Sequence, residues 1–114
     1  MRFRITIPND QPDWLTLPIE PFKPPAPETV TNGVRCVTVP GSSRVNPAAK
    51  TTGWMHDRAA VEKALPAGMY TGLLLSETGE ILEGLSSNFY AILNGELRTA
   101  GEGVQAGIAQ QIVF

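Results

Sequence analysis

The feature that most constrains the fold of this 114-residue chain is a segment over residues 18–27 in which five of ten residues are proline. Each proline fixes its own φ angle and removes a backbone hydrogen-bond donor, so the segment is excluded from helix interiors and central strands. We therefore predict an extended boundary or linker there. A polyproline ligand for an SH3-type partner is the functional alternative.

The residues before the linker alternate in polarity, which predicts a half-buried strand over residues 2–7. Turn-forming residues follow at 8–13, and we expect a second short strand over 14–19. We expect the first strand to be left unpaired where the chain opens. Its apolar members are Phe3, Ile5 and Ile7.

After the linker, residues 33–39 are rich in β-branched side chains and predict a strand. Asn46 and Pro47 have the character of a helix start, with asparagine as the cap and proline at the first helical position. Pro66 would end that helix. Four side chains recur within it at helical spacing, namely Trp54, Arg58, Val61 and Leu65.

The last third of the chain predicts short strands, over residues 70–75 and 81–82 and again on either side of Asn94-Gly95, a strong hairpin signal. A loop punctuated by glycines, 101–107, precedes a helix expected to begin near Ile108. Together these elements predict an α+β fold with mixed or antiparallel strands and a few helices.

Composition excludes several classes of function. The net charge is −2, and no Lys/Arg cluster exceeds two in three residues, which argues against nucleic acid or an anionic membrane surface as partner. No apolar run approaches the roughly 18 residues of a spanning helix, and no signal peptide is evident. With one cysteine, Cys36, and one histidine, His56, we expect no disulfide framework and no metal site. These features predict a cytoplasmic protein.

One stretch has an unusual composition for a plain connection between strands. Residues 82–89 hold one carboxylate, Glu83, then a glycine and three small hydrogen-bonding side chains, Ser86, Ser87 and Asn88. A carboxylate at the rim of an apolar sheet needs a partner, because an unpaired buried charge costs several kcal/mol. A hydrogen-bonded loop between strands is the structural alternative.

Residues 83–89 resemble the Glu-Gly-x-Ser-Ser-Asn-Phe signature of the fold-type IV pyridoxal-phosphate enzymes, the class-IV aminotransferases. Residues 46–52 resemble that family's segment with the cofactor lysine, and residues 99–108 resemble its phosphate loop. The resemblance implies the large domain of an enzyme like D-amino acid aminotransferase for residues 28–114. Residues 1–27 would then be the end of a small N-terminal domain and its linker.

The resemblance implies that Lys50 holds pyridoxal 5'-phosphate as a Schiff base and shuttles a proton during catalysis. A lysine suits this chemistry because its pKa falls readily on burial. The neighbours of Lys50 are small and uncharged over residues 48–52, which would suit an uncharged site.

The same resemblance implies that Glu83 keeps the pyridine nitrogen of the cofactor protonated, while Ser87 and Asn88 hold the loop and the cofactor's polar edge. It places the phosphate over the amides of Gly107, Ile108 and Ala109.

This chain departs from the pattern at the phosphate end. The family usually has Gly-Ile-Thr-Arg where this chain has Ala109 and Gln110 in the last two positions. Gln105 stands where an aliphatic residue packs on the cofactor ring in relatives. These changes are expected to weaken cofactor binding.

The function implied is transfer of an amino group between an amino acid and a 2-oxo acid by a homodimeric enzyme. Aminodeoxychorismate lyase, which uses the same lysine and cofactor and eliminates pyruvate, is the enzymatic alternative. A non-catalytic truncated relative is the third hypothesis. Both ends of the chain interrupt the expected fold, so we expect a portion of a longer protein.

Overall fold

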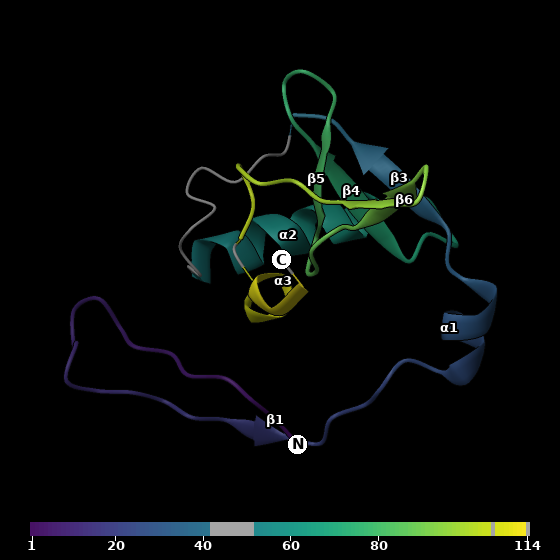
Figure 1. The fold of residues 1–114 in the computed structure, drawn as a ribbon. Helices are drawn as coiled ribbons and strands as arrows, with labels where there is room; N and C mark the ends of the chain where they lie inside the picture. Colours follow the sequence, from purple (N-terminus) through teal and green to yellow (C-terminus); the bar gives the residue numbers. More distant parts are fainter. Residues whose placement is uncertain (42–51, 106, 114) are drawn as a thin grey trace. The chain divides into compact units, whose positions relative to one another are not determined.

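The computed structural model describes residues 1–41, 52–105 and 107–113, and the chain divides into two compact units (Figure 1). The first unit is Met1–Gly33 and the second is Val34–Phe114. The predicted assignment of residues 1–27 and 28–114 to two domains of a known family stays a prediction.

The first unit begins with an antiparallel hairpin rather than with the unpaired strand that we predicted, so that prediction is wrong. Strand β1 (Arg2–Phe3) pairs with β2 (Ile19–Glu20), and Thr6 pairs with Thr16 further along the same hairpin. The turn residues at 8–13 fold the chain back on itself, which gives the first strand its partner. An Arg2–Glu20 ion pair of 2.6 Å closes the open end of the hairpin.

The hairpin has one apolar face. Directly opposed residues lie on the same face of a strand pair, and side chains alternate between faces along each strand. The register Phe3↔Ile19 and Thr6↔Thr16 therefore gathers six large apolar residues on one side. Their exposed fractions run from 48% to 65%, and they are Phe3, Ile5, Ile7, Leu15, Leu17 and Ile19.

Helix α1 (Pro27–Asn32) follows the proline-rich segment and was not predicted. Its signals were present in the sequence: proline at the first helical position, Glu28 in the first turn, and Gly33 just after the end. In the structure Gly33 has a φ of 73°. The four prolines just before these signals, Pro18, Pro21, Pro24 and Pro25, led us to predict an extended segment instead.

A three-stranded sheet forms the centre of the second unit. Strand β3 (Cys36–Val39) runs parallel to β4 (Thr71–Leu75), and β4 runs antiparallel to β5 (Ile81–Gly84). Helix α2 (Thr52–Ala64) comes between β3 and β4 in the chain and packs against β4 (Figure 1). The mixed α+β class is thus confirmed.

The predicted helix face is confirmed as well. Helix α2 ends just before Pro66, and its predicted start at Asn46–Pro47 lies outside the described residues. The side chains at helical spacing are half-buried, namely Trp54, Arg58, Val61 and Leu65.

Among the described residues, the fully buried core is small and lies on β4, on β5 and just after β5. Leu74 and Leu85 are at most 1% exposed, Leu82 is 9% exposed, and Glu83 is 2% exposed. Strand β5 extends through Glu83 and Gly84, which we had placed in the loop after it. The buried carboxylate is therefore on a strand.

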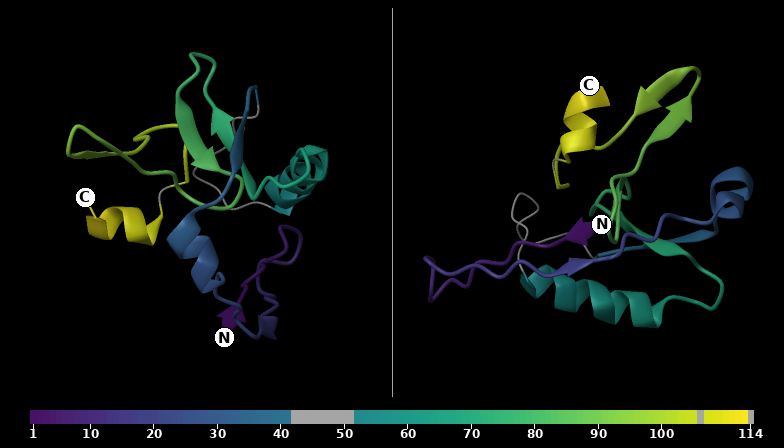
Figure 2. Two further views of the ribbon diagram at one scale, coloured as in Figure 1. Left: turned by 90° about the vertical axis from the view of Figure 1, so that its right-hand side faces the viewer. Right: turned by 90° about the horizontal axis from the view of Figure 1, so that it is seen from below.

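The predicted hairpin around Asn94-Gly95 is confirmed. Strands β6 (Ala91–Leu93) and β7 (Glu96–Arg98) pair antiparallel, and both turn residues have positive φ angles, 53° and 81°, which asparagine and glycine tolerate best. The views in Figure 2 show this hairpin projecting away from the three-stranded sheet. Helix α3 (Ile108–Val113) follows, as predicted near Ile108.

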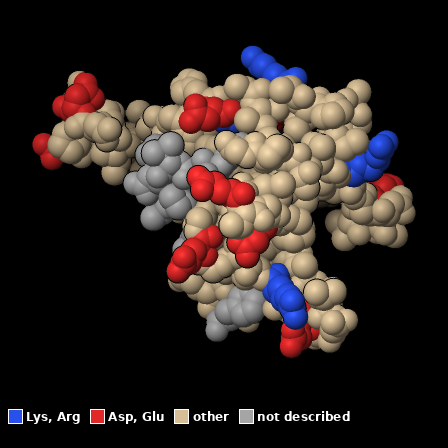
Figure 3. Space-filling view, turned by 90° about the horizontal axis from the view of Figure 1, so that it is seen from above, with Lys and Arg blue, Asp and Glu red and all other residues tan. Residues whose placement is uncertain are grey.

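Charged side chains do not dominate the surface. On the face drawn in Figure 3, residues that are neither acidic nor basic cover most of the area, and Lys and Arg lie apart from one another. Within the described parts of the chain, no helix has both the length and the apolarity to cross a membrane.

We predict that the 114-residue chain self-associates through apolar surface such as the exposed face of the first hairpin. Ile5→Lys should lower the associated fraction in size-exclusion chromatography, because the new charge lies on that face. Thr16→Lys, on the opposite face, is the matched control and should change little. A stable monomer of the unmodified chain at high concentration would contradict this.

Candidate functional site

The site is built on a carboxylate that the fold buries. Glu83 is 2% exposed and lies on β5 between Leu82 and Gly84. Its Oε2 atom accepts a hydrogen bond from the backbone N–H of Gln105, with 3.4 Å between the two atoms. Because a buried carboxylate requires hydrogen-bond donors, this loop contact is part of what makes the burial tolerable.

A tight turn follows the carboxylate and brings Asn88 back beside it. The N–H of Gly84 donates to the carbonyl of Ser87 at 2.8 Å, and Glu83 and Asn88 form an antiparallel bridge. The N–H of Leu85 donates to the carbonyl of Gly72 on β4 at 3.2 Å, which fixes the turn to the sheet. The side chain of Ser87 is exposed, so the turn uses its backbone.

Asn88 connects this turn to the loop before α3. Its Nδ2 atom donates to the carbonyl of Gln105 at 2.9 Å. The backbone of Gln105 thus bonds to Asn88 through its C=O and to Glu83 through its N–H, across 17 and 22 positions of sequence.

Gly107 lies against the same asparagine. A Cβ atom at Gly107 would stand 2.5 Å from Oδ1 of Asn88, which is closer than real Cβ contacts come, so only glycine fits without a shift. Helix α3 begins at the next residue, Ile108, whose side chain is 79% exposed, and Ala109 lies in its first turn. The N–H of Gln111 donates to the carbonyl of Gly107 at 3.2 Å.

Gln110 attaches α3 to the rest of the second unit. Its Nε2 atom donates to the carbonyl of Ala100 at 3.2 Å, across the loop that leads to the helix. Nearby, the hydroxyl of Thr99 donates to the carbonyl of Phe89 at 2.7 Å. Gln110 thus has a structural role at the position where the expected pattern has arginine.

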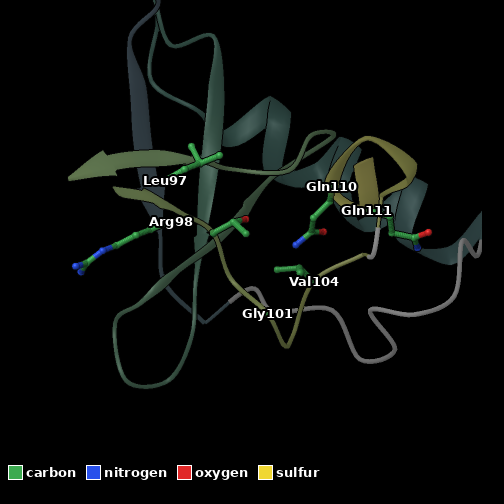
Figure 4. Close-up of a pocket in the computed structure, with 7 residues that line it drawn as sticks. Leu97, Arg98, Gly101, Val104, Gln110 and Gln111 are labelled. Atoms are coloured by element: carbon green, nitrogen blue, oxygen red, sulfur yellow. The ribbon is translucent and has the colours of Figure 1, made fainter. Parts of the chain in front are cut away.

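A cavity of about 670 Å³ lies between β7 and α3. In Figure 4 the side chain of Gln110 turns toward Val104, whereas Arg98 and Gln111 point away from each other to either side. Glu83 and Asn88 do not line this cavity. It is lined by Leu97, Arg98, Thr99, Gly101, Val104, Gln110 and Gln111.

The structure therefore brings together three of the predicted site residues, Glu83, Asn88 and Gly107. The side chains of Ser87 and Ile108 are exposed, and Lys50 lies outside the described residues. Nothing in the sequence indicates that the backbone of Gln105 joins Glu83 to Asn88, because backbone groups are the same at every residue except proline.

Comparison with known protein families identifies the family of the chain. The sequence pattern that defines the amino-transferase class IV family matches residues 3–114. The chain belongs to this family. No individual curated protein matches the chain. The resemblance drawn from three motifs is thus confirmed at the level of the class IV aminotransferase family, whose members typically depend on pyridoxal phosphate.

The described residues fit the pyridine end of that cofactor better than its phosphate end. A buried carboxylate on a strand, held by a hydrogen-bonded loop, has the chemistry to pair with a ring nitrogen. At the other end, the backbone amides at the start of α3 can face an anion, but Ala109 has no hydroxyl and Gln110 has no charge.

We predict that Gln110→Ala loosens α3, because it removes the hydrogen bond to Ala100, worth about 1 kcal/mol. The measurement is amide hydrogen exchange of the α3 residues, which should speed up. Gln111→Ala is the matched control, since it makes the same chemical change at the next residue of α3, whose side chain is exposed. Equal effects of the two substitutions would show that the Ala100 contact does not hold the helix.

Proposed function

We propose that this class IV aminotransferase chain carries the pyridoxal-phosphate site of an enzyme that moves an amino group from an amino acid to a 2-oxo acid. The observation that supports this most is the burial of the Glu83 carboxylate, with its Oε2 atom held by the loop that leads to α3. Folding alone would favour an apolar residue at this position, since burying a carboxylate costs several kcal/mol.

Glu83 would pair with the pyridine nitrogen and keep its proton in place. Pyridoxal phosphate, when bound, supplies a protonated ring that stabilises negative charge at the substrate α-carbon. A carboxylate can hold that proton only while it is ionised and close to the ring nitrogen. The antiparallel bridge with Asn88 and the Gln105 contact limit its movement.

Lys50 would attach the cofactor and carry a proton to and from the substrate α-carbon. Its support is the match of the family pattern across residues 3–114 together with its place in the Asn46–Thr52 segment. A lysine can serve in both roles because its amine is nucleophilic when neutral.

The phosphate would lie at the amides of Gly107, Ile108 and Ala109, where α3 begins. Relative to a residue with a hydroxyl, Ala109 removes one hydrogen bond, or about 1 kcal/mol of binding. We therefore propose weak cofactor binding by this chain. The full enzyme would be a cytoplasmic homodimer with amino acids and 2-oxo acids as its small-molecule partners.

The first test uses reductive labelling. Borohydride treatment of the protein mixed with pyridoxal phosphate should fix the cofactor on the peptide that contains Lys50, as read by mass spectrometry. Lys50→Ala should abolish this label. Lys63, in the last turn of α2, is the exposed control and should remain unlabelled at low cofactor concentration.

Two outcomes would contradict the proposal. Saturable labelling at Lys63 with Lys50 untouched would place the site elsewhere. Labelling spread evenly over Lys23, Lys50 and Lys63 would mean adventitious attachment without a preformed site. Release of pyruvate from aminodeoxychorismate by the unreduced protein, supplied with pyridoxal phosphate, would instead identify it as the lyase.

The second test concerns the carboxylate. Glu83→Gln should retain labelling at Lys50, because the covalent bond is made by another residue, yet it should lower transaminase turnover by about a hundredfold. The readouts are the labelled fraction and the turnover number, measured on the same preparation. Unchanged turnover would mean that Glu83 is not the partner of the ring nitrogen.

A further inference from the structure

Both polar atoms of the Asn88 side-chain amide lie close to the loop before α3. Nδ2 donates to the carbonyl of Gln105 at 2.9 Å, and Oδ1 lies where a side chain on Gly107 would collide with it, 2.5 Å from the Cβ position. The backbone of Asn88 is also bridged to Glu83. Asn88 therefore bonds to Gln105, the loop residue that faces the carboxylate, and lies close to Gly107 two positions later.

The two hydrogen bonds of the Gln105 backbone differ in length. The bond from its N–H to Oε2 of Glu83 is 3.4 Å, beyond the usual range for an N–H donor, whereas the bond that its carbonyl accepts from Asn88 is 2.9 Å. A long bond is easily broken by a small displacement of the donor. The shorter bond at the same residue limits that displacement.

We propose that Asn88 is a positioning residue for the Glu83 carboxylate and acts through the backbone of Gln105. The contacts stand on their own, whereas their meaning for catalysis rests on the proposed function. With the Gln105 N–H in place, the carboxylate keeps one orientation on β5.

This proposal accounts for two features of the chain. Gly107 has no side chain because the Asn88 amide occupies the space that a Cβ would need. Gln105 can stand where the resemblance predicts an aliphatic residue without loss of its bonds to Asn88 and Glu83, since both hydrogen bonds use its backbone.

The proposed role requires a side-chain amide at position 88, because its N–H is the donor to the Gln105 carbonyl. Aspartate has the same shape but no N–H, so it would set an oxygen against the carbonyl oxygen of Gln105 and bring a second negative charge toward Glu83. Asn88→Asp thus removes the hydrogen bond to the Gln105 carbonyl with almost no change in side-chain volume.

The test is amide hydrogen exchange by NMR on the chain without cofactor. In Asn88→Asp, exchange of the Gln105 N–H should speed up by about tenfold, the loss expected for one hydrogen bond. The Leu85 N–H, which donates to Gly72, should change by less than about twofold. Asn9→Asp makes the same chemical change at an exposed turn residue and should leave both rates unchanged.

Gly107→Ala gives a second, independent perturbation. Its Cβ should displace the Asn88 amide and speed Gln105 exchange in the same selective way. Equal acceleration at Gln105 and Leu85 would mean that Asn88 only supports overall stability, which would overturn the proposal. An unchanged Gln105 rate in both variants would also overturn it.

A cofactor readout separates this inference from the proposed function. Asn88→Asp should weaken pyridoxal-phosphate binding several-fold in the wild-type background and have less effect in Glu83→Gln, because the effect passes through that carboxylate. Equal effects in both backgrounds would overturn the proposal. If the unmodified chain takes up no cofactor, the proposed function fails, and the exchange rates still decide the role of Asn88.

Discussion

The burial of one carboxylate, Glu83, is the constraint on which the second unit depends. In the part of the chain that the structure describes, the buried apolar side chains are Leu74, Leu82 and Leu85, so there is little apolar burial to offset the cost of burying a charge. The loop residue Gln105 supplies an N–H to that carboxylate, and Asn88 holds the loop residue. Strand β5, the turn after it and the loop before α3 are therefore coupled by hydrogen bonds across more than twenty residues of sequence.

That coupling gives the site its shape. A strand end fixes Glu83, a tight turn returns Asn88 to it, and Asn88 closely approaches Gly107, the residue just before α3. Gln110 then attaches the helix to Ala100, at the position where the resemblance led us to expect arginine. At the pyridine end of the proposed site, Glu83 is thus held by hydrogen bonds, while at the proposed phosphate end Gln110 makes a structural contact.

The two units differ in how they use apolar residues. In the second unit, Leu74 on β4 and Leu85 just after β5 are almost completely buried. In the first unit, the hairpin collects its apolar side chains on one face and leaves them about half exposed. A two-stranded hairpin has no second layer of its own, which is why such a face favours association.

The sequence by itself determined the local structure. Asn94-Gly95 predicted a hairpin because those residues accept positive φ, and Pro66 predicted the end of α2. The resemblance to family motifs named Glu83, Asn88 and Gly107 as candidate site residues, and their role stays a prediction. Helix α1 could have been found from its proline and glycine ends.

Only the tertiary structure decided how these parts combine. It paired the first strand with residues 16–20, continued β5 through Glu83, and joined Glu83 to Asn88 through Gln105. The physical reason is that strand pairing and the Gln105 contacts use backbone N–H and C=O groups. These groups are alike at nearly every residue, so their hydrogen-bond partners depend on the fold and cannot be predicted from residue identity.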